Sequence, residues 1–153
     1  MKDLIVLLVA CIVLVLCVCI YSVNAAEISI GYSPFSYHVD RPDKNDDINE
    51  NPNGIGVSYN GWSIVTFENS FFNRSWFLGK QFKWKEWSNN SLFWGINIYA
   101  GILKGYDNDF NVGGWSPAVA PTFEFGKGHY SLETSYMPTI HGGVFVGMLK
   151  YTF

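Results

Sequence analysis

Hydrophobic and polar residues alternate with a period of two along most of the chain after Glu27. The clearest case is the final stretch, 144–153, where one side of the pattern is apolar and aromatic and the other is mixed. Successive side chains of a β-strand point to opposite faces, so this period indicates strands. Because no segment after Glu27 repeats with the helical period, the sequence predicts an all-β protein.

Eight segments carry the alternation, and clusters of Gly, Asn, Asp and Pro separate them. They span 28–40, 54–60, 62–69, 75–87, 91–105, 116–125, 129–137 and 144–153. The connections are tight at 60–61, 88–90 and 126–128 but long and polar at 41–53, 70–74, 106–115 and 138–143. This pattern is typical of outer-membrane barrels, although the last segment alone also fits the edge of a soluble sandwich. We therefore predict an eight-stranded antiparallel transmembrane β-barrel over residues 27–153.

The two faces of the strands predict what contacts lipid and what lines the lumen. The more apolar face should contact lipid. The other is charged near the tight turns, at Lys83, Lys85, Glu124, Glu133 and Lys150, and small or apolar near the long loops, at Tyr99, Gly101, Leu103, Ala118, Ala120, Met137, Val144 and Val146. A barrel this narrow is filled by side chains or holds one slender ligand. We expect a slot for a hydrocarbon chain in the apolar half; the alternative is a solid barrel whose small residues fit its taper.

Prolines mark places where the barrel wall should be interrupted. Pro117 and Pro121 lie in the sixth predicted strand, where each removes a backbone donor. Such a break would make a lateral opening in the apolar half, and Pro34 and Pro138 could do the same elsewhere. The alternative is that these prolines mark only strand ends and bulges.

The first 26 residues have the layout of a secretory signal peptide. Met1-Lys2-Asp3 precedes an apolar run over 4–21 and then the small-residue pattern Val23-Asn24-Ala25. An uncleaved apolar membrane segment is the alternative. The three cysteines all lie in this run, so cleavage would leave no thiol chemistry in the mature chain. The net charge of −3 argues against a nucleic-acid partner.

The predicted topology gathers the candidate reactive groups at the long-loop end. They are His38, Asn69, Ser70, Asp107, Asp109 and His141. A histidine with a serine is the minimum for base-assisted acyl transfer. From spacing alone, a strand-capping role for His38 and a turn role for Ser70 are favoured over catalysis. The first long loop carries Asp40, Asp43, Asp46, Asp47 and Glu50, which could bind a divalent cation weakly but fit a solvated loop better. We predict no metal and no cofactor, since the sequence has neither a His/Cys cluster nor a glycine-rich phosphate loop.

Several stretches resemble the lipid A palmitoyltransferases of the outer membrane (PagP-type). The similarity is clearest at 99–108, 117–128 and 135–153, and weaker at 34–38, 51–58 and 67–76. The resemblance implies an eight-stranded barrel that binds one phospholipid acyl chain and transfers it to lipid A. It also implies a glycerophospholipid donor, a lipid A-like acceptor, lateral lipid access through proline-marked gaps, and a monomer in the outer membrane with long loops outside.

The resemblance also implies the site residues. The family's catalytic histidine, aspartate and serine correspond to His38, Asn69 and Ser70, so the aspartate is replaced by an amide that can orient a partner but cannot act as a base. The acyl-length gate should fall near 79–82, and the amphipathic helix that precedes the first strand in the family is lacking. The implied acyl pocket and lateral gate comprise Pro34, Gly79, Gly101, Pro117, Ala118, Ala120, Pro121, Met137 and Pro138.

Two other functions remain open from the sequence. One is a non-enzymatic barrel that binds lipid or transports a small solute, which the asparagine at position 69 favours. The other is a structural or adhesive barrel whose acidic first loop, 40–53, binds a partner.

Overall fold

The computed structural model describes residues 27–39, 47–106, 111–139 and 142–153. The predicted signal peptide over 1–26 and the candidate residues Asp40, Asp43, Asp46, Asp107, Asp109 and His141 lie outside the described residues. Within the described ranges, no helix is long and apolar enough to cross a membrane.

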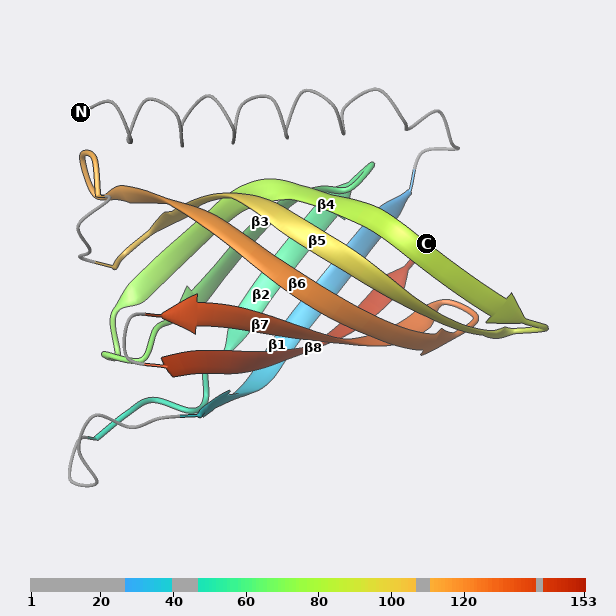
Figure 1. The fold of residues 1–153 in the computed structure, drawn as a ribbon, viewed down its shortest axis with the longest axis horizontal. Helices are drawn as coiled ribbons and strands as arrows, with labels where there is room; N and C mark the ends of the chain where they lie inside the picture. Colours follow the sequence, from blue (N-terminus) through green and yellow to red (C-terminus); the bar gives the residue numbers. More distant parts are fainter. Residues whose placement is uncertain (1–26, 40–46, 107–110, 140–141) are drawn as a thin grey trace.

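Eight antiparallel strands close into a single barrel (Figure 1). They are β1 (Ile28–His38), β2 (Gly54–Tyr59), β3 (Trp62–Glu68), β4 (Arg74–Asn89), β5 (Leu92–Lys104), β6 (Trp115–Lys127), β7 (Tyr130–Thr139) and β8 (Gly142–Thr152). Each strand pairs with the next along the chain, and β1 pairs with β8 to complete the ring. The predicted all-β barrel is confirmed, and each strand boundary falls within two residues of its predicted position.

The turns sort the barrel into two ends. Asn60 and Gly61 have φ angles of 50° and 78°, the left-handed conformation of a two-residue hairpin turn. The other tight turns lie at the same end as this hairpin, together with the start of β1 and the end of β8 (Figure 1). We call this the tight-turn end and the opposite one the long-loop end.

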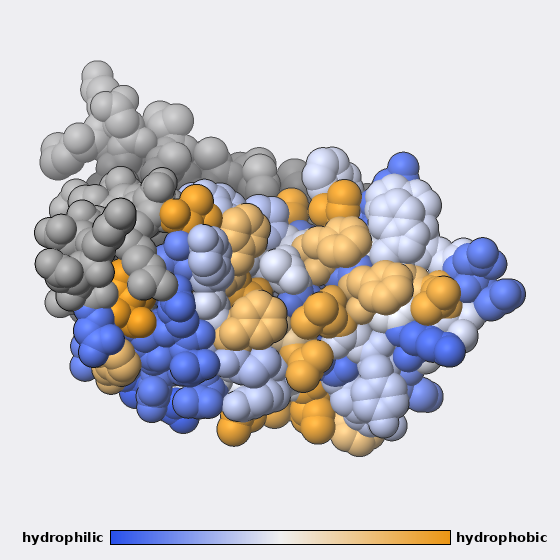
Figure 2. Space-filling model, turned by 90° about the horizontal axis from the view of Figure 1, so that it is seen from below, coloured by the Kyte–Doolittle hydropathy of each residue, from blue (hydrophilic) through white to orange (hydrophobic). Residues whose placement is uncertain are grey.

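The barrel is apolar outside and polar inside. Large outward residues remain exposed, for example Ile64 at 55% and Leu149 at 54%. Apolar side chains gather in the middle of one face, with hydrophilic ones toward its two ends (Figure 2). Among the described residues, the only buried hydrophobic ones are Tyr99 and Ala120, whereas many buried residues are polar or charged. This inverted distribution suits a wall that faces hydrocarbon.

A β-bulge in β4 corrects one predicted lumen residue. Lys83 pairs with Asn97, but Lys85 pairs with Ile96, so one extra residue, Trp84, interrupts the register. The extra residue reverses the alternation and turns Lys85 outward, where its ammonium lies 4.9 Å from the centre of the Trp87 ring. The prediction that Lys85 lines the lumen is therefore wrong.

A hydrogen-bonded charge cluster fills the lumen toward the tight-turn end. Lys150 Nζ lies 2.7 Å from both Glu124 Oε1 and Glu133 Oε1. Further donors reach the two carboxylates: Gln81 Nε2 (2.7 Å) and the Tyr99 hydroxyl (3.0 Å) to Glu133, and Asn97 Nδ2 (2.9 Å) and Ser131 Oγ (2.8 Å) to Glu124. We call these seven residues the floor cluster. Because they come from five consecutive strands, β4 to β8, the cluster ties the barrel together across its lumen.

Candidate active site at the long-loop end

A bulge in β1 turns His38 into the barrel. Tyr32 pairs with Leu149 and Phe35 with Gly147, so Ser33 and Pro34 together oppose the single residue between those partners. After this extra residue the even-numbered positions face inward, and His38 ends β1 only 9% exposed. Proline suits a bulge because it has no N–H to leave unpaired in the ladder. Pro34 thus lies at the point that decides which way His38 points.

His38 and Ser70 meet at the long-loop end. Ser70 follows β3, and its hydroxyl oxygen lies 2.7 Å from His38 Nε2. When Nε2 is unprotonated, the Ser70 hydroxyl donates to it and the imidazole can take the proton. This is the geometry of a nucleophile with its base. The structure therefore brings two of the three predicted catalytic residues into direct contact.

Asn69 lies beside this pair but directs its amide elsewhere. The side chain is 1% exposed, and all four of its hydrogen-bonding positions are occupied. Its Oδ1 accepts from the backbone N–H groups of Phe71 (2.9 Å) and Asn73 (3.0 Å), and its Nδ2 donates to the Gly105 carbonyl (2.7 Å) and to Ser75 Oγ (3.1 Å). Asn69 thus fixes the loop that carries Ser70 against β4 and the end of β5. None of these four bonds goes to His38.

Restoring the family's aspartate should therefore weaken this site. We expect Asn69→Asp to destabilise the barrel by about 1–3 kcal/mol at neutral pH, since a buried carboxylate cannot donate to the Gly105 carbonyl. Burial and contact with that carbonyl oxygen raise the pKa of the introduced carboxyl, and we expect them to outweigh the N–H groups of Phe71 and Asn73, which lower it. The protonated carboxyl can still donate to the Gly105 carbonyl, so the loss of stability should be small at low pH. The loss should grow as the pH rises through this raised pKa.

Urea unfolding in detergent micelles at several pH values measures this deficit. Asn73→Asp, at an exposed position of the same loop, is the matched control. An Asn69→Asp barrel as stable as the wild type at neutral pH would contradict the assignment of the amide.

Tyr106 is a site residue that the sequence did not single out. It follows Gly105 at the end of β5, and its hydroxyl lies near both the side chain and the backbone of Ser70. Burial raises the pKa of Tyr106, although the bonds to Ser70 act in the opposite direction, so the phenol stays protonated at neutral pH. A tyrosine after a strand carries no motif, so only the fold reveals this contact.

Asn49 anchors Ser70 from the first long loop. Its backbone N–H donates to the Ser70 carbonyl at 3.1 Å, and its side chain is 7% exposed. Its Oδ1 accepts from the backbone N–H of Asn51 at 2.9 Å. Ser70 is thus held by Asn49 through its backbone carbonyl, and the Tyr106 hydroxyl lies near it from the end of β5.

The apolar side chains of the lumen near this site are less buried than the floor cluster. Its inward apolar side chains are only half-buried, in contrast to Glu133, which is 1% exposed. These half-buried residues are Val65, Phe67, Phe77, Leu103, Ala118, Met137, Val144 and Val146. The Phe77 ring meets the edge of Tyr99, with 6.1 Å between ring centres, where the apolar part of the lumen reaches the floor cluster. This half of the lumen therefore keeps accessible apolar surface.

Gly79 and Gly101 form a close pair in the wall of this half. They are directly opposite each other in β4 and β5. A Cβ added at Gly101 would come within 2.5 Å of Gly79 Cα and even closer to the Leu78 carbonyl oxygen. Because that contact is with backbone, the strands could not relieve it by moving a side chain. The two glycines thus keep the strands close, and the Phe77 ring packs over Gly79.

The hydrogen-bonded wall is shortened at two places at the long-loop end. The β6–β7 ladder stops at the pair Thr122 and Ser135, which leaves 115–121 of β6 without partners in β7. The β1–β2 ladder stops at the pair Ser33 and Gly54, immediately before Pro34. The other three prolines of the expected gate, Pro117, Pro121 and Pro138, lie where β6 and β7 do not pair with each other, although β6 still pairs there with β5 and β7 with β8.

The closed ring of eight antiparallel strands, apolar outside and polar inside, defines an outer-membrane-type barrel. No family model matches the chain, and no curated protein matches it. Among solved structures, the chain is similar to the Yersinia pestis outer membrane protein Ail, whose backbone structure was determined in a phospholipid bilayer nanodisc. The two share 15% sequence identity with a TM-score of 0.45, and the match covers 84% of this chain and 98% of that one.

Proposed function

We propose that this protein is an outer-membrane acyltransferase that moves a fatty acyl chain from a glycerophospholipid to a lipid A-like acceptor. The observation that carries the proposal is the 2.7 Å contact between His38 Nε2 and Ser70 Oγ. This pair lies at the long-loop end, where the lumen keeps accessible apolar surface. A nucleophile with its base beside an apolar lumen is what transfer of a hydrocarbon chain requires.

The proposed reaction has two steps. Ser70 Oγ attacks the ester carbonyl carbon of the donor while His38 Nε2 takes the hydroxyl proton. The lysophospholipid oxygen leaves with that proton, and the acyl chain remains as an ester on Ser70. An acceptor hydroxyl then loses its proton to His38 and attacks the same carbonyl carbon, which returns the Ser70 hydroxyl and releases the acylated acceptor.

The lumen would hold the chain during both steps. The apolar side chains of the upper lumen would contact the hydrocarbon, and the shortened ladders beside Pro34 and Pro121 would admit it from the bilayer. Phe77 and Tyr99 would stop its end, because the floor cluster beyond them is filled and charged. The exposed apolar outer surface supports a place in the outer membrane, and we propose a monomer with the long loops outside.

A direct test uses purified protein in detergent with a phospholipid radiolabelled in its acyl chains and lipid A as acceptor. The proposal expects the label to move from the phospholipid to an acylated lipid A, in amounts that grow with time and with the amount of protein. Label found only in the starting phospholipid, with the barrel shown to be folded by its resistance to SDS at room temperature, would overturn it.

Asn69 favours a second candidate, a barrel that binds lipid without turning it over. All four hydrogen-bonding positions of Asn69 are taken by groups other than His38, and an amide cannot act as a base as the family's aspartate does. This candidate expects a phospholipid that co-purifies with the folded barrel and stays intact through a long incubation with lipid A.

Tyr106→Phe should lower the transfer rate about fivefold to tenfold, since one hydrogen bond to Ser70 is worth about 1 kcal/mol. The loss should appear in kcat with KM unchanged, because the hydroxyl orients the nucleophile and does not bind the chain. Tyr130→Phe, at the exposed tight-turn end, is the control. Equal rates for the two variants would remove Tyr106 from the site.

A further inference from the structure

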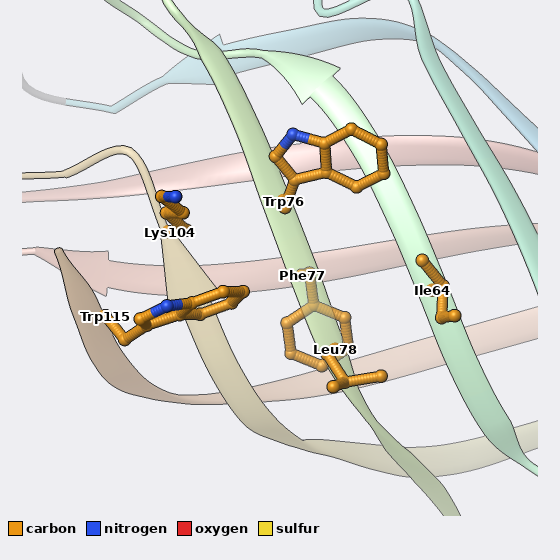
Figure 3. A pocket seen from close by; sticks show the side chains of 6 residues that line it. All are labelled: Ile64, Trp76, Phe77, Leu78, Lys104 and Trp115. Carbon is orange, nitrogen blue, oxygen red and sulfur yellow. The ribbon is translucent and has the colours of Figure 1, made fainter. Parts of the chain in front are cut away.

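A groove of about 300 Å³ lies on the outer wall near the long-loop end (Figure 3). It crosses β3 to β6 and is lined by Ile64, Trp76, Phe77, Leu78, Lys104 and Trp115. The Phe77 ring belongs to the inner face, while the other five residues alternate outward. Five of the six lining residues thus place the groove on the outer face, and neither His38 nor Ser70 lines it.

One cation stands over this apolar groove. Lys104 is the register partner of both Trp76 and Trp115, so it lies between two tryptophans on the outer face. Its ammonium is 5.7 Å from the centre of the Trp115 ring. In the part of the chain that the structure describes, no carboxylate lies within ion-pair distance of Lys104.

Lys104 is the one positively charged residue among those that line the groove. Arg74 faces the same side one step nearer the rim, but its register partner in β3 is the carboxylate-bearing Glu68. Tryptophan favours the boundary between hydrocarbon and headgroups, and lysine beside a membrane attracts anionic headgroups. The groove thus offers an apolar channel for a chain and a positive charge where its headgroup would lie.

From this charge complementarity we propose that the groove binds an anionic phospholipid, with an acyl chain along Ile64 and Leu78 and the headgroup phosphate on Lys104. The site does not depend on the proposed acyl transfer. The groove nevertheless lies close to the loop that carries Ser70. Gly105 follows Lys104 in the chain, and its carbonyl accepts the 2.7 Å hydrogen bond from Asn69. A lipid bound in the groove would contact the outer face of β5, and the end of β5 is hydrogen-bonded to the loop that carries Ser70.

Lys80 provides a matched control at the opposite end of the wall. It also faces outward, and its ammonium lies 5.6 Å from the Trp62 ring and 5.7 Å from the Phe82 ring. Trp62 begins β3 beside the hairpin turn, at the tight-turn end. Lys80 therefore has the same chemistry as Lys104 but does not line the groove.

Native mass spectrometry of the folded barrel in detergent, titrated with phosphatidylglycerol or with phosphatidylcholine, tests the proposal without any need for turnover. We expect the first phosphatidylglycerol to bind about fivefold more tightly than phosphatidylcholine, in line with one lysine at a membrane surface. Lys104→Gln should equalise the two lipids, whereas Lys80→Gln should keep the preference. Leu78→Trp, which fills the groove, should weaken both.

Three results would overturn the proposal. One is equal binding of the two lipids by the wild-type barrel. Another is a preference that survives Lys104→Gln. The third is full competition by inorganic phosphate, because the acyl chain would then contribute nothing to binding.

Discussion

Alanine in place of Ser70 or of His38 is expected to lower the rate of acyl transfer by about 10²–10⁴-fold each. The reason is the direct contact of Nε2 with Oγ at 2.7 Å, which makes the two side chains one unit of nucleophile and base. Residues that act as a unit lose activity together, so the double variant should be little slower than either single variant. Initial rates with a labelled phospholipid donor, measured on variants that remain folded, give this comparison.

The chain offers matched controls for both substitutions. His129 and Ser88 are exposed at the tight-turn end, far along the chain from the site, and the His129 imidazole hydrogen-bonds to the Thr152 carbonyl. His129→Ala and Ser88→Ala should leave the rate unchanged. Wild-type turnover in the Ser70→Ala barrel would remove the serine as nucleophile, whatever the controls show.

Lys150→Met should destabilise the barrel by about 3–5 kcal/mol, because it leaves two buried carboxylates without their cation. Glu124 and Glu133 both lie 2.7 Å from the lysine and are 5% and 1% exposed as residues. Their other partners are neutral donors, which cannot balance two negative charges in the lumen. Urea unfolding in micelles, followed by tryptophan fluorescence, measures the loss.

Lys83→Met is the control for this prediction. Lys83 pairs with Glu27 at 3.0 Å, but both side chains are about half exposed, so its removal should cost at most about 1 kcal/mol. The double variant Lys150→Met with Glu133→Gln should recover part of the loss by removing one of the two charges. A Lys150→Met barrel as stable as the Lys83→Met barrel would show that the floor cluster does not hold the strands together.

Local sequence patterns were sufficient for the strands but not for their bulges. Alternation and turn residues predict where β1 to β8 begin and end, because both depend on neighbours in the chain. The bulge at Trp84 has no such signal, and it is why Lys85 was expected inside but lies outside. At the bulge in β1, Pro34 is visible in the sequence, but the reversal of facing that it accompanies is not.

In the candidate site, too, local sequence predicts some features and only the fold reveals the others. His38 and Ser70 can be chosen from the sequence because histidine and serine at one end of a barrel have a chemical use. The bond from Asn69 to Gly105 joins positions far apart in the chain, and so does the contact of Tyr106 with Ser70. Such contacts follow from how β3 and β5 are placed in the ring, which no local pattern encodes.

The bulge at Ser33 and Pro34 makes the length of β1 matter more than its composition. Removing any one residue between Ile28 and His38 would swap inside for outside over the rest of the strand and carry the imidazole to the hydrocarbon side. Point changes there leave that parity intact. Over evolutionary time this segment should therefore accept replacements freely while resisting single insertions and deletions, and a two-residue indel should be less harmful than a one-residue indel.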